Sequence, residues 1–73
     1  MEEKVNIIQL MINDALGGKS VSQLFSTRYM SIVSPLYDLG WLPNYLEWNY
    51  LCDNGVKLEV VSLGDCYKLT VSM

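Results

Sequence analysis

The chain has 73 residues, of which 51% are hydrophobic and 18% are charged, and its formal net charge at pH 7 is −3. A chain of this length makes one domain, 1–73, and its apolar content is far above that of a disordered protein. The excess of acidic over basic residues argues against a protein that binds nucleic acid through its phosphates, because such proteins carry a basic face.

The residue types needed for most catalytic and metal sites are scarce in this sequence. It contains no histidine and only two cysteines, Cys52 and Cys66. A Ser-His or Cys-His nucleophile therefore cannot form, and two thiolates alone do not complete a tetrahedral zinc site. The carboxylates are scattered, without a spacing that would hold a pair in a cleft for acid and base catalysis. We expect a protein that is not an enzyme and that needs no metal or cofactor.

The start of the sequence bears on localisation. The residues MEEK are acidic and the apolar run IIQLMI is short, so the sequence predicts neither an export signal nor a membrane-spanning segment. We therefore expect a cytoplasmic protein with reduced cysteines and no membrane partner.

The first predicted element is a helix from about Glu3 to Ala15. Apolar residues recur there at helical spacing, and the acidic residues at its start suit the positive end of a helix dipole. Gly17 and Gly18 supply a stop. The apolar positions are Val5, Ile8, Leu10, Met11, Ile12 and Leu16.

A second helix is predicted to begin at Ser20, because Ser20 and Gln23 have the spacing of a capping box. The apolar positions from Val21 to Val33 follow helical spacing. Pro35 is predicted to end this helix, since proline lacks an amide donor. Ser34 and Pro35 can themselves open a short third helix, Pro35 to Leu39.

A β-meander is predicted in the remainder of the chain. From Leu46 the sequence alternates between apolar and polar residues, and the DNG sequence at 53–55 is typical of a hairpin loop. A three-residue loop pairs Tyr50 with Leu58, whereas a two-residue loop would pair Tyr50 with Glu59, so we favour the longer loop.

The same loop pairs Trp48 with Val60. A second turn at Gly64 and Asp65 leads to a third strand, whose residues Tyr67, Leu69 and Val71 share the face of Leu58 and Val60. The predicted fold class is thus α+β: two helices and a short third helix, followed by a three-stranded antiparallel meander.

This order of elements resembles the winged helix-turn-helix family, in particular the small helix-turn-helix proteins common in phage genomes. SVSQ at 20–23 is similar to the opening of the second helix in that family. The spacing of Val33, Leu36, Leu39, Gly40 and Trp41 is similar to the end of its recognition helix. The resemblance covers roughly residues 18–69 and implies a winged-helix-like fold.

The resemblance also implies a DNA-binding transcriptional regulator as one candidate function. The residues that it would place on DNA are Lys19, Thr27, Arg28, Ser31, Ser34, Tyr37 and Lys57. Asp38, Asp53 and Glu59 would lie close to the same phosphates and repel them. We therefore prefer the other candidate, in which the partner is a protein.

The preferred interpretation is a small regulatory or inhibitory protein of phage or mobile-element type that binds another protein, which could belong to the host. The surplus of apolar residues also fits pairing with a second copy of the chain. Trp41 and Trp48 are predicted to lie inside, whereas exposed aromatic, methionine and aliphatic side chains are typical of protein interfaces. The predicted protein-binding residues are Met30, Tyr37, Asp38, Tyr45 and Leu51.

Overall fold

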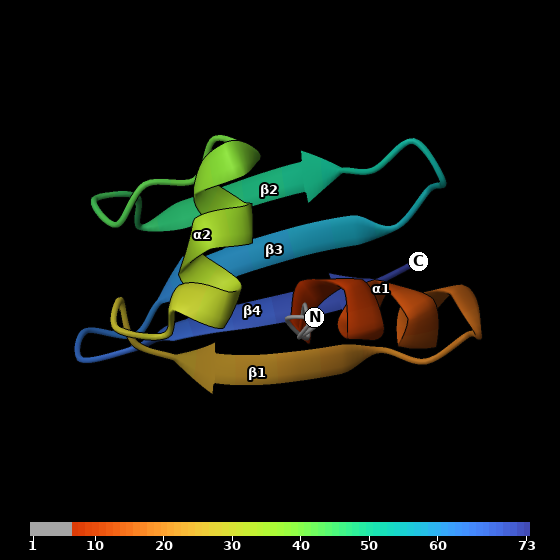
Figure 1. Ribbon diagram of the computed structural model, residues 1–73, viewed down its shortest axis with the longest axis horizontal. Helices are drawn as coiled ribbons and strands as arrows, with labels where there is room; N and C mark the ends of the chain where they lie inside the picture. The colour runs from red at the N-terminus through yellow and green to blue at the C-terminus, as the bar shows by residue number, and fades with distance from the viewer. Residues whose placement is uncertain (1–6) are drawn as a thin grey trace, which may run out of the picture.

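A computed structural model describes residues 7–73 of the chain, which form two helices and a four-stranded sheet. In chain order the elements are α1 Ile7–Leu16, β1 Val21–Phe25, α2 Met30–Asp38, β2 Glu47–Leu51, β3 Lys57–Ser62 and β4 Tyr67–Ser72. The strands are antiparallel neighbours in the order β1-β4-β3-β2. Both helices lie on the same face of the sheet (Figure 1). The predicted α+β class is therefore confirmed, although its details differ.

The predicted second helix beginning at Ser20 is wrong, because this segment forms strand β1. Val21 pairs with Val71 and Phe25 pairs with Tyr67, so β1 completes the sheet alongside β4. The helical spacing in this segment included Leu24, whose side chain is instead 55% exposed. Backbone pairing with β4 outweighs the local capping-box preference, which is a weak determinant compared with tertiary context.

The predicted break at Pro35 and the separate third helix are also wrong. Helix α2 runs through Pro35 without interruption, from Met30 to Asp38. Proline leaves the carbonyl of Ser31, four residues earlier, without its helical donor. Ser31 is exposed, so water can hydrogen-bond to that carbonyl, and the buried side of α2 is enough to keep the helix together.

Replacing Pro35 with alanine is expected to stabilise the protein by about 1–2 kcal/mol. Alanine restores the donor to the Ser31 carbonyl and removes the ring clash. Proline disfavours a helix interior by roughly 3 kcal/mol, and we expect the substitution to recover part of that free energy. Urea unfolding followed by circular dichroism measures the change. An unchanged or lower midpoint would show that the proline costs nothing in α2.

The end of α2 directs Trp41 into the core. Gly40 has a φ of 103°, and the N–H of Trp41 donates to the carbonyl of Leu36 at 2.9 Å. The N–H of Gly40 donates to the carbonyl of Tyr37 at 3.0 Å. These two bonds form a Schellman motif, which needs a residue in the left-handed region and therefore favours glycine at position 40.

The predicted meander is confirmed as strands β2, β3 and β4. Trp48 pairs with Val60 and Tyr50 pairs with Leu58, as the three-residue loop requires. Gly55, at the end of that loop, has a φ of 90°. The sheet has one strand more than predicted, because β1 joins it at the free side of β4.

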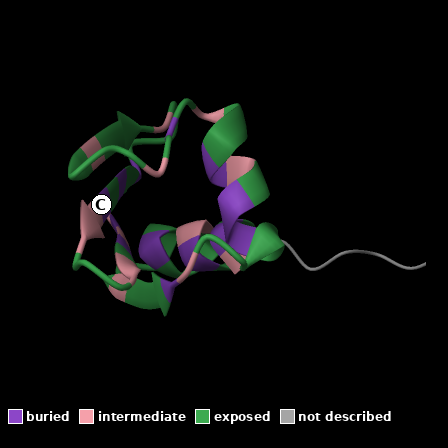
Figure 2. Cartoon of the chain, turned by 90° about the vertical axis from the view of Figure 1, so that its left-hand side faces the viewer, coloured by how far each residue is buried: buried purple, intermediate pink, exposed green. Residues whose placement is uncertain are grey.

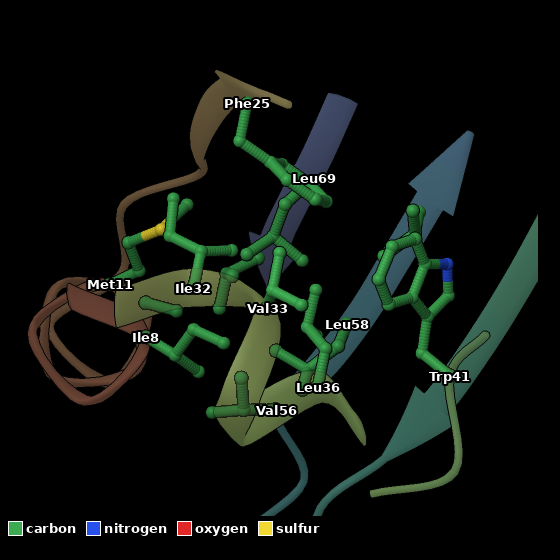
Figure 3. Packing of buried hydrophobic residues seen from close by; sticks show 13 residues of the cluster. Ile8, Met11, Phe25, Ile32, Val33, Leu36, Trp41, Val56, Leu58 and Leu69 are labelled. Atoms are coloured by element: carbon green, nitrogen blue, oxygen red, sulfur yellow. The ribbon is translucent and has the colours of Figure 1, made fainter. Parts of the chain in front are cut away.

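The core lies between the helices and the sheet (Figures 2 and 3). Helix α1 contributes Ile8, Met11 and Ala15 to the core. The predicted first helix is confirmed over Ile7–Leu16, and its predicted start at Glu3 lies outside the described residues. The other buried hydrophobic residues are Phe25, Ile32, Val33, Leu36, Trp41, Val56, Leu58, Val60, Leu69 and Val71. The opposite face of the sheet is not covered by either helix, so it will be called the open face (Figure 1).

Candidate protein-binding surface

One side of α2 faces solvent and carries large side chains. Met30, Ser34 and Tyr37 are spaced by four and three residues, so they lie on the same side of the helix. Met30 is 62% exposed and Tyr37 is 41% exposed. The opposite side of α2 is buried, so packing against the core fixes which side faces outward.

The ring of Tyr37 is held in place although it is exposed. It stacks on Trp41, with ring centroids 5.6 Å apart and an interplanar angle of 17°. Trp41 in turn meets Tyr67 edge to face at a centroid distance of 5.2 Å. An aromatic side chain fixed in this way loses little conformational freedom when a partner covers it.

The loop from α2 to β2 also carries large exposed side chains. Its residues Leu42, Tyr45 and Leu46 are exposed, and Leu46 most of all, at 77%. The hydroxyl of Tyr67 donates to the carbonyl of Pro43 at 2.6 Å, which ties the loop to β4. The name α2 surface is used below for Met30, Ser34, Tyr37, Asp38, Leu42, Tyr45 and Leu46.

Comparisons of the chain with protein-family models, curated proteins and solved structures give no match. The chemistry of the described surfaces is therefore the basis for assigning a function.

Four of the five predicted protein-binding residues belong to the α2 surface. Met30, Tyr37 and Asp38 come from the helix, and Tyr45 comes from the loop that follows it. Leu51 lies apart from them. Trp48 and Tyr50 occupy the helix side of β2, so the alternation of the strand places Leu51 on the open face, beside Lys57.

Leu42 and Leu46 are exposed residues of the α2 surface that the sequence did not single out. Alternation placed Leu46 in the same row as Trp48, which is half-buried. Leu46 lies just before the first residue of β2, Glu47, and its side chain remains exposed although it belongs to that row. Tyr29, which precedes α2, is also 55% exposed, although helical spacing counted from Val21 would place it on the buried side of the predicted second helix.

The predicted DNA-binding residues are spread over the molecule. Lys19 precedes β1 whereas Thr27 and Arg28 follow it, so they lie at opposite ends of that strand (Figure 1). Ser31 and Ser34 are on α2, on the helix side of the sheet, and Lys57 is on the open face, opposite Leu51 on β2. The structure therefore does not gather these residues into one basic surface.

The open face carries a shallow depression of about 540 Å³. It is lined by Asn49, Tyr50, Leu51, Lys57, Leu58, Glu59, Thr70 and Ser72.

Among residues 7–73 there is no group of three or more His, Cys, Asp or Glu side chains that could hold a metal ion, and no helix long and apolar enough to cross a membrane.

Cys52 and Cys66 are free thiols. Partial burial, and then the negative charge of Asp53, raise the pKa of the Cys52 thiol. A raised pKa lowers the fraction of thiolate, which is the nucleophilic and metal-binding form. Cys52 follows the end of β2 and packs against the hydrophobic core.

Proposed function

We propose that this protein is a non-enzymatic binding module, a small regulatory or inhibitory protein that binds another protein through the α2 surface. The observation that carries the proposal is the ring of Tyr37, which is 41% exposed and yet held against Trp41. Rigid, exposed aromatic side chains are the residues that contribute most to protein interfaces.

The composition of the α2 surface supports a protein partner. The α2 surface holds two tyrosines, two leucines and Met30 but a single charged residue, Asp38. The cores of protein interfaces are likewise enriched in aromatic residues and methionine and depleted of charge. The unbranched thioether of Met30 can adapt to the contours of a partner. The surface contains no lysine or arginine, which favours a protein over the phosphates of a nucleic acid.

Replacing Met30 with aspartate is expected to weaken binding by at least tenfold, because it places a charge in an apolar interface. Met30 is the first residue of α2, where a carboxylate interacts favourably with the helix dipole, so the fold is not weakened. The immobilised protein is incubated with an extract of its native cells, bound proteins are identified by mass spectrometry, and the affinity of each is then measured by calorimetry.

Leu24→Asp is the matched control. Leu24 is 55% exposed, close to the 62% of Met30, but it lies on the open face beside Lys68. We expect this variant to retain the bound protein at its original affinity. Equal losses from the two variants, or specific retention of duplex DNA in place of a protein, would contradict the proposed function.

A further inference from the structure

Within residues 7–73, β2 is an edge strand of the sheet, and three of its residues direct their backbone groups outward. The N–H of Cys52 donates to Val56 and the N–H of Ser62 donates to Leu46, so even-numbered residues of β2 face β3. Backbone direction alternates along a strand. The N–H and C=O groups of Glu47, Asn49 and Leu51 therefore point away from the sheet, where another strand can pair with them.

Strand β2 lacks most of the features that protect edge strands, and Glu47 is its single charged residue. It has no proline and no lysine, and its pairing with β3 runs without a bulge from Glu47 to Leu51. Tyr50 and Leu51 are exposed on its two faces. The other edge strand, β1, differs, because the Gln23 side-chain amide donates to the backbone carbonyl of Leu24 at 3.2 Å.

We propose that a second copy of this chain pairs with β2, antiparallel and around a two-fold axis at Asn49. Asn49 then lies opposite Asn49 of the second copy, and Glu47 lies opposite Leu51 of the second copy. All three outward positions of one β2 meet the outward positions of the other, and each pair exchanges both of its hydrogen bonds. The two sheets become one, with all helices on the same side.

Charge favours this register over the registers that are shifted by two residues in either direction. On the open face, Glu47 lies next to Leu51 of the second copy. Lys57 of the second copy lies on the far side of that leucine, because Leu51 and Lys57 are paired between β2 and β3 of each chain. A shift by two residues in one direction places Glu47 opposite Asp53 of the second copy. A shift in the other direction places Glu47 opposite Asn49, behind which lies Glu59. Only the proposed register brings Glu47 toward a cation.

The helix side of the sheet fits the same register. Trp48 and Tyr50 already stack within one chain, with centroids 5.8 Å apart. Pairing around Asn49 places Trp48 opposite Tyr50 of the second copy. Val60 of the first chain flanks this pair on one side, and Leu58 of the second copy flanks it on the other. This apolar row covers Tyr50, which is 36% exposed in the single chain. A register shifted by one residue would instead place Tyr50 opposite Asn49 or Glu47 of the second copy, both of which are polar.

Sedimentation equilibrium tests the pairing. We expect the full chain to be dimeric at about 100 μM, an affinity within the range of small edge-to-edge interfaces, and Asn49→Pro to be monomeric. The amide of Asn49 points to the free edge, so proline there removes no bond between β2 and β3. Circular dichroism of Asn49→Pro checks that the monomer remains folded.

A charge exchange tests the register. Glu47→Lys places a lysine toward Lys57 of the second copy and is expected to weaken the dimer about tenfold. The double variant Glu47→Lys with Lys57→Glu is expected to recover the original dissociation constant. Within one chain Glu47 pairs with Val61 and Lys57 pairs with Leu51, so Glu47 and Lys57 of the same chain are not neighbours. A rescue by the double variant therefore reports on the interaction between the two copies.

Hydrogen exchange of the unmodified protein gives a measurement that needs no variant. The amides of Glu47, Asn49 and Leu51 are expected to exchange more slowly as protein concentration rises. A wild-type chain that stays monomeric up to about 1 mM, a dimer that survives Asn49→Pro, or a charge exchange without rescue would overturn the proposal. None of these results depends on Met30 or Tyr37, so the proposed partner binding stands or falls separately.

Discussion

Replacing Trp41 with alanine is expected to destabilise the protein by about 3–5 kcal/mol. Trp41 is fully buried and its ring meets Phe25, Tyr37 and Tyr67. The shortened side chain leaves a cavity and removes three ring contacts at once. Small domains are stable by only about 5–15 kcal/mol, so a large share of the molecules will unfold under mild denaturant.

Urea unfolding followed by far-ultraviolet circular dichroism measures this loss, and Trp41→Phe is the matched comparison. The indole Nε1 of Trp41 is buried without a hydrogen-bond partner among the described residues, and an unpaired buried donor costs about 1–3 kcal/mol. Phenylalanine removes that donor and keeps most of the ring, so we expect it to cost less than half as much as alanine. Equal losses for the two variants would show that the ring contacts contribute little.

Replacing Tyr37 with alanine is expected to weaken partner binding by about 2 kcal/mol, or roughly thirtyfold. The change removes the fixed aromatic ring of the α2 surface. It also removes the stack on Trp41 and should therefore cost about 0.5–1.5 kcal/mol of stability. Isothermal titration with the captured partner, at a temperature where both proteins are folded, measures the binding term.

Tyr37→Phe separates the ring from its hydroxyl. It retains the stack on Trp41 and should keep the affinity within about threefold, provided that the ring supplies the contact. If alanine at position 37 binds as tightly as tyrosine, Tyr37 is not the anchor of the interface. A loss in Tyr37→Phe as large as that in Tyr37→Ala would instead point to a hydrogen bond from the hydroxyl.

The β-hairpin could be predicted in detail from local sequence because two independent signals agree there. The period of two residues places Trp48 and Tyr50 on one side, and Gly55 accepts the positive φ that a three-residue loop needs. Strand β1 could not be predicted in this way. Its partner β4 lies far along the chain, and the apolar spacing from Val21 to Phe25 is too short to separate a strand from a helix.

Pro35 illustrates a second limit of local reasoning. Proline usually marks a boundary, but the buried residues Ile32, Val33 and Leu36 keep α2 continuous around it. The same helical spacing correctly placed Met30 and Tyr37 outside. Leu51 was grouped with them because exposure can be predicted from alternation, whereas the side of the sheet on which a residue lies depends on where the helices pack.

Strand β4 is the last element in chain order and yet an interior strand of the sheet, hydrogen-bonded to β1 on one side and to β3 on the other. During synthesis, residues 21–62 therefore cannot close their sheet until Tyr67–Ser72 has left the ribosome. Until then β1 has no neighbour, and the β2–β3 hairpin alone is marginal in water. Nascent chains should thus remain sensitive to proteases until β4 has emerged and then become resistant in a single step.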